Sequence, residues 1–213
     1  MRYESPTTTK EAVTLLSKEK GKAFVLAGGT DLLVRLHMDT IDPDLMIDIK
    51  RIPAMNEIKK TTTGFKIGAA VSGKQLGASK ALVKAWPGVV EATKLIGSDQ
   101  VQGRCTMVGN LCNASPAADS VPAMIAAGAK AVIVGKTRRR TVAVESIITG
   151  PGQTSLAEGE IVEAITLPKR PAKSGDAYLR FIPRTEMDIA VVGVAVSLTC
   201  KRGVIDTARV SLG

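Results

Sequence analysis

Short runs of apolar residues alternate with glycine-rich or polar turns along most of the chain. Runs of about five apolar or β-branched residues between such turns are typical of buried strands, whereas apolar positions three and four apart indicate helices. The predicted helices are 9–17, 32–36, the two parts of 79–96 on either side of Pro87-Gly88, and 116–127. The predicted strands are 23–27, 45–49, 65–69, 130–134, 140–144, 160–167, 177–182, 189–199 and 204–212. We expect Thr9 to cap the first helix and Pro116 to begin the last one.

A proline- and lysine-rich segment, 168–175, interrupts this pattern and looks like a linker. About forty residues follow it, which is little from which to build an independent core. They read as strands, and the sequence stops on a strand and a turn. We therefore expect a first domain over 1–172 and a second over 173–213 that is incomplete here.

Composition adds that the chain can bury a core. Its 213 residues are 45% hydrophobic but only 3% aromatic, so aliphatic side chains must form most of that core. No apolar run approaches the roughly 20 residues that span a bilayer, and the first residues form no apolar signal region. The expectation is a cytoplasmic protein without a membrane span.

Charge and cysteine content argue against several classes of site. The net charge of +9 is spread along the chain, and its one dense cluster, 136–140, has no interleaved aromatic residues for base stacking. We interpret that cluster as a solvated or partner-facing turn rather than a nucleic-acid site. The three cysteines form no C-x-x-C pair, and His37 is the single histidine, expected to be structural. A metal centre and a histidine-based catalytic triad are therefore not expected.

The first segment that suggests ligand chemistry is the turn Gly28-Gly29-Thr30-Asp31, between a predicted strand and a predicted helix. Glycines let backbone N–H groups converge on an anion, and a threonine adds a hydroxyl donor. Asp31 would repel a phosphate, so we expect it to cap the helix or to bond a ribose hydroxyl. Neither G-x-G-x-x-G nor a Walker loop is present. A plain strand-to-helix turn is the alternative interpretation.

The second segment runs from Thr106 to Asp119 and is rich in short polar side chains. Gly109 permits close approach of the backbone, and Asn110 and Asn113 offer amide donors and acceptors. The edge of a flavin ring carries alternating donors and acceptors that need such groups. The alternative is an asparagine-rich turn that leads into a helix. Together with the glycine turn, this segment predicts one extended ligand, with a dinucleotide as the natural candidate.

In combination, 26–32 and 106–122 resemble the FAD-binding subunit of molybdenum hydroxylases. That family includes the medium chain of aerobic carbon monoxide dehydrogenase and the flavin domain of xanthine dehydrogenase. The similarity continues in 100–104 and 183–190 and covers nearly the whole chain in order. One departure is that Met107 and Val108 stand where the family usually reads T-I-G-G-N. Val108 thus places a branched side chain where backbone commonly approaches the cofactor.

The resemblance implies a two-lobed α+β FAD-binding domain of the vanillyl-alcohol-oxidase/PCMH type, followed by the start of a smaller C-terminal α+β domain. It implies that residues of the glycine turn wrap the FAD pyrophosphate, namely Ala27, Gly28, Gly29, Thr30, Asp31 and Leu32, and that Leu26 before them also belongs to the cofactor site. It further implies contacts with the flavin, ribityl or adenosine parts from Thr106, Val108, Gly109, Asn110, Asn113 and Asp119. By position, Ile96 and Val162 pack near the flavin, and Arg180 falls where relatives often carry a lysine near the ring.

The function implied is that of an electron-transfer subunit with no catalytic residue of its own. Its partners would be a molybdopterin-containing large subunit and a [2Fe-2S] small subunit, with NAD or another external electron acceptor. Two alternatives stay open. One is a stand-alone FAD oxidoreductase of the same superfamily. The other is an assembly subunit that has lost FAD, for which Val108 is the only indication.

Overall fold

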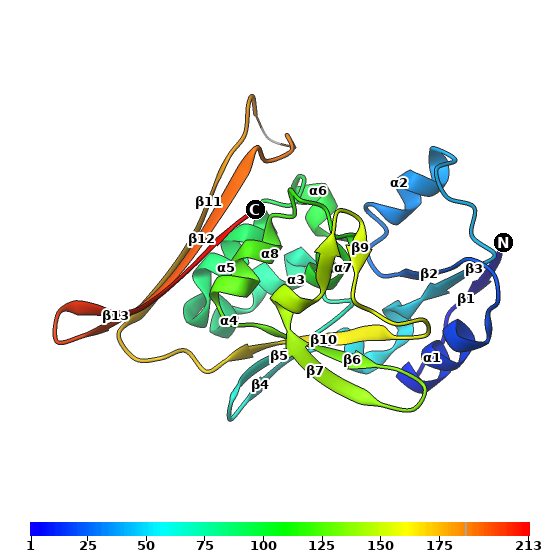
Figure 1. The fold of residues 1–213 in the computed structure, drawn as a ribbon, viewed down its shortest axis with the longest axis horizontal. Helices are drawn as coiled ribbons and strands as arrows, with labels where there is room; N and C mark the ends of the chain where they lie inside the picture. Colours follow the sequence, from blue (N-terminus) through cyan, green and yellow to red (C-terminus); the bar gives the residue numbers. More distant parts are fainter. Residues whose placement is uncertain (186) are drawn as a thin grey trace.

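Two lobes and a long three-stranded sheet make up the chain (Figure 1), which confirms the mixed, two-lobed fold expected from the sequence. The computed structural model describes residues 1–185 and 187–213, so Glu186 of the similar segment 183–190 lies outside the described residues. No helix in the described part of the chain is long and apolar enough to cross a membrane.

The first lobe contains a parallel sheet in the order β1-β3-β2. Its elements are β1 (Arg2–Glu4), α1 (Thr9–Lys18), β2 (Ala23–Leu26), α2 (Leu32–His37) and β3 (Leu45–Asp48). The central strand β3 pairs with a strand on each side, and all four of its residues are buried. Thr8, not Thr9, caps α1, since its hydroxyl accepts the N–H of Glu11. The predicted capping residue was therefore wrong by one position.

The second lobe is a five-stranded antiparallel sheet in the order β4-β5-β10-β6-β7, with helices beside it (Figure 1). Its strands are β4 (Ile58–Thr61), β5 (Gly64–Gly68), β6 (Lys130–Val134), β7 (Arg139–Ala143) and β10 (Ile161–Pro168). Its α-helices are α3 (Gly73–Ala78), α4 (Lys80–Ala85), α5 (Pro87–Lys94), α6 (Asp99–Gln102), α7 (Met107–Asn113) and α8 (Ser120–Ala126). The short elements are η1 (Ile49–Arg51), η2 (Pro53–Met55), η3 (Val144–Ser146), β8 (Ile148–Gly150) and β9 (Gln153–Thr154).

The helix predicted over 116–127 begins later than expected. Ala114 adopts a left-handed conformation (φ 51°) at the end of α7, and a turn follows it before α8 starts at Ser120. Pro122, rather than Pro116, lies in the first turn of this helix, where its missing N–H costs no hydrogen bond.

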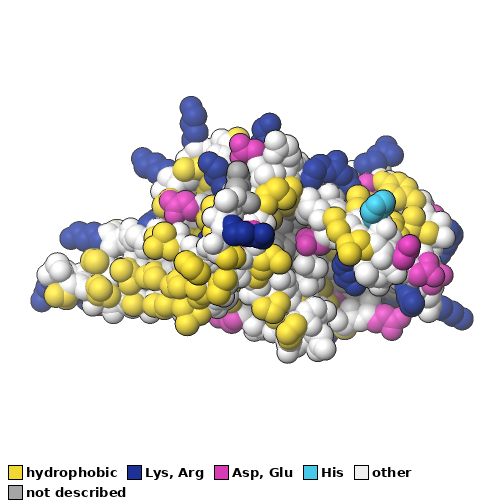
Figure 2. Space-filling model, turned by 90° about the horizontal axis from the view of Figure 1, so that it is seen from above, with side chains coloured by type: hydrophobic (Ala, Val, Ile, Leu, Met, Phe, Trp, Pro, Cys, Tyr) yellow, Lys and Arg dark blue, Asp and Glu magenta, His cyan; other side chains and the backbone are white. Residues whose placement is uncertain are grey.

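The last element is an antiparallel sheet of β11 (Ser174–Phe181), β12 (Val192–Lys201) and β13 (Val204–Leu212). Its inner face packs on α5 and α8, and there Tyr178 and Ala195 are buried. Its outer face is apolar and open to solvent (Figure 2), with Leu179 76% and Phe181 61% exposed. More exposed and more buried residues therefore alternate along β11, and each of its two faces can pack against other protein.

Candidate functional site

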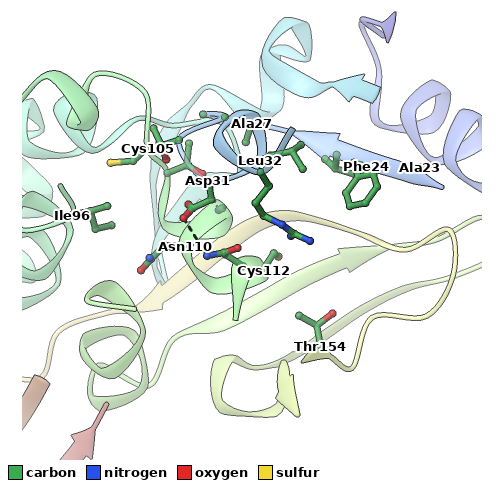
Figure 3. A pocket seen from close by; sticks show the side chains of 18 residues that line it. Ala23, Phe24, Ala27, Asp31, Leu32, Ile96, Cys105, Asn110, Cys112 and Thr154 are labelled. Carbon is green, nitrogen blue, oxygen red and sulfur yellow. Dashed lines mark hydrogen bonds between the residues drawn. The ribbon is translucent and has the colours of Figure 1, made fainter. Parts of the chain in front are cut away.

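A cavity of about 370 Å³ lies between the β2–α2 turn and α7 (Figure 3). It brings together two segments that are nearly eighty positions apart, from Gly28 to Thr106. Its lining comprises Ala23, Phe24, Val25, Ala27, Gly28, Gly29, Thr30, Asp31, Leu32, Arg35, Ile96, Cys105, Thr106, Gly109, Asn110, Cys112, Asn113 and Thr154. Residues of both polar segments thus line the same cavity.

The glycine turn is held against the second segment by backbone packing. A Cβ at Gly28 would stand 2.0 Å from the carbonyl oxygen of Arg104, so no other residue fits there without displacement of backbone. Gly29 has a φ of 80°, which L side chains rarely adopt. Lys50 Nζ donates to the carbonyl of Ala27 at 3.1 Å, and Arg104 Nε approaches that of Gly28 at 3.4 Å. The carbonyl oxygens of Ala27 and Gly28 therefore face side chains of the protein itself.

The N–H groups of the same turn are free. Within the described residues, no acceptor faces the backbone N–H of any residue from Gly28 to Leu32. Backbone donors at a protein's surface or cavity wall must be satisfied by water or by a ligand. Five consecutive free donors beside a cavity form a site suited to an anion.

Asp31 does not cap α2, because its side chain makes no capping hydrogen bond. It accepts instead from Asn113 Nδ2 at 3.2 Å, which joins the two segments across the cavity (Figure 3). The capping alternative for Asp31 was wrong. Partial burial raises the pKa of Asp31, and the charge of Arg35 opposes that rise.

The second polar segment is mostly helix rather than loop. Thr106 caps α7 by accepting the N–H of Gly109 on its hydroxyl at 2.9 Å. The side-chain oxygen of Asn110 accepts from both the N–H (3.2 Å) and the hydroxyl (2.6 Å) of Ser120, which ties α7 to α8. The side-chain NH₂ of Asn110 has no partner among the described residues. This amide is a donor available to a ligand in the cavity.

Most of the residues expected at a cofactor line this cavity. They are Ala27, Gly28, Gly29, Thr30, Asp31, Leu32, Ile96, Thr106, Gly109, Asn110 and Asn113. The structure places Leu26, Val108, Asp119, Val162 and Arg180 outside the lining. Leu26, Val108 and Val162 are buried apolar residues, and Val108 and Val162 belong to the main core. The branched side chain of Val108 therefore does not fill the cavity.

Asp119 and Arg180 form a buried cluster next to the cavity. Asp119 accepts from the Tyr178 hydroxyl and from Arg180 Nη1, both at 2.9 Å. Arg180 also donates to the carbonyl of Leu95 at 2.8 Å, immediately before the lining residue Ile96. Burial raises the pKa of Asp119, and its two partners oppose the rise. The cluster fixes β11 to the start of α8 and to the end of α5.

Several lining residues were not expected from the sequence. They are Ala23, Phe24, Val25, Arg35, Cys105, Cys112 and Thr154. Arg35 had a usable signal, since it stands one helical turn after Asp31. Thr154 had none, because it comes from the distant hairpin of β8 and β9. Burial raises the pKa of the Cys105 thiol to about 11 and that of Cys112 to about 12, so neither thiol is a ready nucleophile at neutral pH.

This geometry suits binding rather than acid–base chemistry. Among the described lining residues, only Asp31 and Arg35 carry a formal charge, and none is histidine. In the described part of the chain no group of three or more His, Cys, Asp or Glu side chains could hold a metal ion. The cavity can therefore hold a polar, anionic ligand along walls that are mostly uncharged.

Comparisons with known proteins agree on one family. Residues 1–170 match the family model described as the FAD binding domain in molybdopterin dehydrogenase. The carbon monoxide dehydrogenase medium chain of Hydrogenophaga pseudoflava is 32% identical over 99% of this chain and 73% of its own length. The xanthine dehydrogenase FAD-binding subunit of Escherichia coli O157:H7 is 30% identical over 99% of this chain and 73% of its own length.

Solved structures give the same result. The chain superposes on a carbon monoxide dehydrogenase from Hydrogenophaga pseudoflava with a TM-score of 0.95 and 32% identity, covering 100% of this chain and 74% of that one. Quinoline 2-oxidoreductase from Pseudomonas putida 86 shares the fold at a TM-score of 0.92 and 24% identity, covering 100% of this chain and 73% of that one.

Proposed function

This chain belongs to the family of FAD-binding domains of molybdopterin dehydrogenases, and on that premise we propose that it is the electron-transfer subunit of a molybdenum hydroxylase. It is an oxidoreductase component with FAD as its cofactor, as its family membership shows. The single observation that carries the proposal is the row of five free backbone N–H groups, Gly28 to Leu32, across the cavity from Asn110 and Asn113.

The residues present fit FAD. The free N–H groups of the turn suit a diphosphate, and the open amide of Asn110 suits the polar edge of a flavin or the ribityl hydroxyls. At Gly109 a Cβ would meet only the Thr106 hydroxyl at 3.0 Å, so this side of the helix leaves room for close approach. We propose that Ala27 to Leu32, Ile96, Thr106, Gly109, Asn110 and Asn113 bind the cofactor directly.

The remaining expected residues support the site from outside the cavity in this proposal. Leu26, Val108 and Val162 form its apolar backing. Asp119 and Arg180 are positioning residues, because they hold β11 and the end of α5 next to Ile96.

FAD, when bound, supplies the redox chemistry of such a subunit, and the protein supplies binding, orientation and electrostatics. The chain's own residues match that division of work. The cavity walls offer hydrogen-bond donors and apolar contacts, and Asp31 is the only carboxylate among the described lining residues. A general base placed over a substrate is therefore not evident, which favours the relay over a stand-alone oxidoreductase.

The proposed partners are a molybdopterin-containing large subunit and a [2Fe-2S] small subunit. The electrons would come from the small subunit and leave to NAD or another acceptor. Support comes from relatives that are named as a medium chain and as an FAD-binding subunit. We propose a cytoplasmic location for this complex.

We propose a domain boundary at 172/173, which places β11–β13 in a second unit. The apolar outer face of this sheet supports the boundary, since a contiguous exposed apolar surface of this kind marks a contact with further protein. The match covers 73% of the length of the Hydrogenophaga pseudoflava medium chain, so about a quarter of that relative lies outside it.

Two measurements test the proposed function. The purified chain, mixed with FAD and freed of excess by gel filtration, should show flavin absorption bands with about one FAD per chain. Co-expression with candidate large and small chains should then recover a complex whose flavin is reduced when substrate is added. A chain without bound flavin would refute the proposal in favour of an assembly subunit. Turnover by the isolated flavin-loaded chain would favour the stand-alone oxidoreductase.

A further inference from the structure

Arg35 is a cation at the edge of the cavity, and its charge acts on Asp31 without a direct ion pair among the described residues. It lines the cavity and lies on α2, four positions after Asp31. Its backbone is fixed, because its N–H donates to the carbonyl of Asp31 at 3.0 Å and its carbonyl accepts the N–H of Thr40 at 3.0 Å. Its guanidinium forms no hydrogen bond or ion pair with any described residue. The side chain is therefore anchored at its root and free at its charged end.

The other charges at the cavity indicate what role the Arg35 cation has. Asp31 supplies one negative charge at the same site, and a diphosphate would add two more. The free N–H groups carry only partial charges. Lys50 and Arg104 also lie at the turn, but they bond the carbonyls of Ala27 and Gly28 and do not line the cavity. Arg35 can therefore offset the repulsion between Asp31 and a diphosphate from within the cavity. Arg35 is the sole full positive charge on the described lining.

We propose that Arg35 is the residue that makes this cavity selective for a flavin bearing a diphosphate over one without it. The inference rests on the proposed function, since it concerns the same FAD site. A guanidinium presents several N–H donors in a planar fork that matches phosphate oxygens, which lysine and glutamine cannot reproduce. Arg35 thus acts on the diphosphate end of the ligand and has no part in holding the flavin ring.

The test compares R35Q, R35K and the unmutated chain. R51Q is the matched control, because Arg51 is an exposed arginine that does not line the cavity. Dissociation constants for FAD and for riboflavin are measured by fluorescence at 50 mM and 500 mM NaCl. Thermal melting without ligand shows that each variant is folded.

For R35Q we expect the FAD dissociation constant at low salt to rise about tenfold, the size of one charge-assisted hydrogen bond. The FAD dissociation constant of R35K should lie between those of R35Q and the unmutated chain, and that of R51Q should equal the unmutated value. The loss in R35Q should shrink at 500 mM NaCl, since salt screens an exposed charge pair. Riboflavin binding should not change.

An FAD affinity of folded R35Q within twofold of the unmutated chain would overturn the inference while leaving the proposed function in place. An equal loss of riboflavin affinity would also overturn it, because Arg35 would then serve the flavin end. Failure of the unmutated chain to bind FAD would refute the proposed function, and the role of Arg35 with it.

Discussion

Substitution of Gly28 by alanine tests most sharply how the glycine turn is built. The added Cβ would lie 2.0 Å from the carbonyl oxygen of Arg104, 2.7 Å from its carbonyl carbon and 3.0 Å from Cα of Cys105. All three atoms belong to the backbone, so no side-chain rotation relieves the contact. The turn and the segment before α7 must separate until the shortest distance reaches about 3.4 Å, where ordinary contact begins.

The expected cost follows from this displacement. Overpacking of a well-packed site costs about 1–3 kcal/mol, and a backbone contact belongs at the upper end. Alanine also lowers the entropy of the unfolded chain, which returns roughly 0.4–1 kcal/mol. The net loss in the free energy of unfolding should therefore be about 2 kcal/mol. Because the turn and α7 form opposite walls of the cavity, FAD affinity should fall at least about tenfold as well.

Urea unfolding and FAD titration measure the two effects. Gly77→Ala is the matched control, because Gly77 lies within α3 and its added Cβ would meet only the flexible side chain of Lys94 at 3.5 Å. That variant should be as stable as the unmutated chain or more stable by up to about 1 kcal/mol, since alanine favours helix. If Gly28→Ala were as stable as Gly77→Ala and bound FAD equally well, the described packing of the turn would be wrong.

Three further predictions concern buried groups outside the turn. Hydrogen bonds from Arg140 lower the pKa of Glu160 to about 2, so the stabilisation from this pair is present above the unfolded pKa near 4.5 and is lost as the pH falls toward 2. Urea melts at several pH values should show this loss in the free energy of unfolding. E160Q should weaken that pH dependence, whereas the same pH dependence in E160Q and the unmutated chain would contradict the pairing. Asp119→Ala removes the acceptor of the Tyr178 hydroxyl and the counter-charge of Arg180, which keeps only its bond to Leu95, and should lower the free energy of unfolding by about 3 kcal/mol. A loss under about 1 kcal/mol would count against a structural role for this cluster. With a thiol reagent at pH 8, the exposed Cys200 should react roughly a hundredfold faster than Cys105, because burial shields the Cys105 thiol and raises its pKa to about 11. Equal rates in the folded chain would show that Cys105 is accessible.

The elements that the sequence predicted are those with strong local patterns. Apolar runs bounded by turns located β2, β3, β5, β6, β10 and β13 to within one or two residues. Elements with mixed composition were missed. The strand β4 contains two lysines because it is an edge strand with exposed side chains. The helix α7 contains a glycine and two asparagines, and its stability comes from the Thr106 cap and from packing rather than from helix propensity.

The cavity residues that could be predicted are those that belong to the two polar segments of the sequence. Glycines after an apolar strand and asparagines near a second turn pointed to residues of both walls. Arg35, Phe24 and Thr154 were missed, because a residue's place on the wall depends on how α2 and the β8–β9 hairpin dock. Asp119 has the polar character of a binding residue but is satisfied by Tyr178 and Arg180, a pairing that only the tertiary structure reveals.

The most direct measurement of the central claim is an experimental structure of this chain with FAD. We predict that the diphosphate lies within hydrogen-bond distance of the backbone N–H groups of Gly28 to Leu32, with the flavin or ribityl part beside Asn110 and Ile96. FAD bound at any other surface, with these N–H groups bonded only to water, would contradict the account.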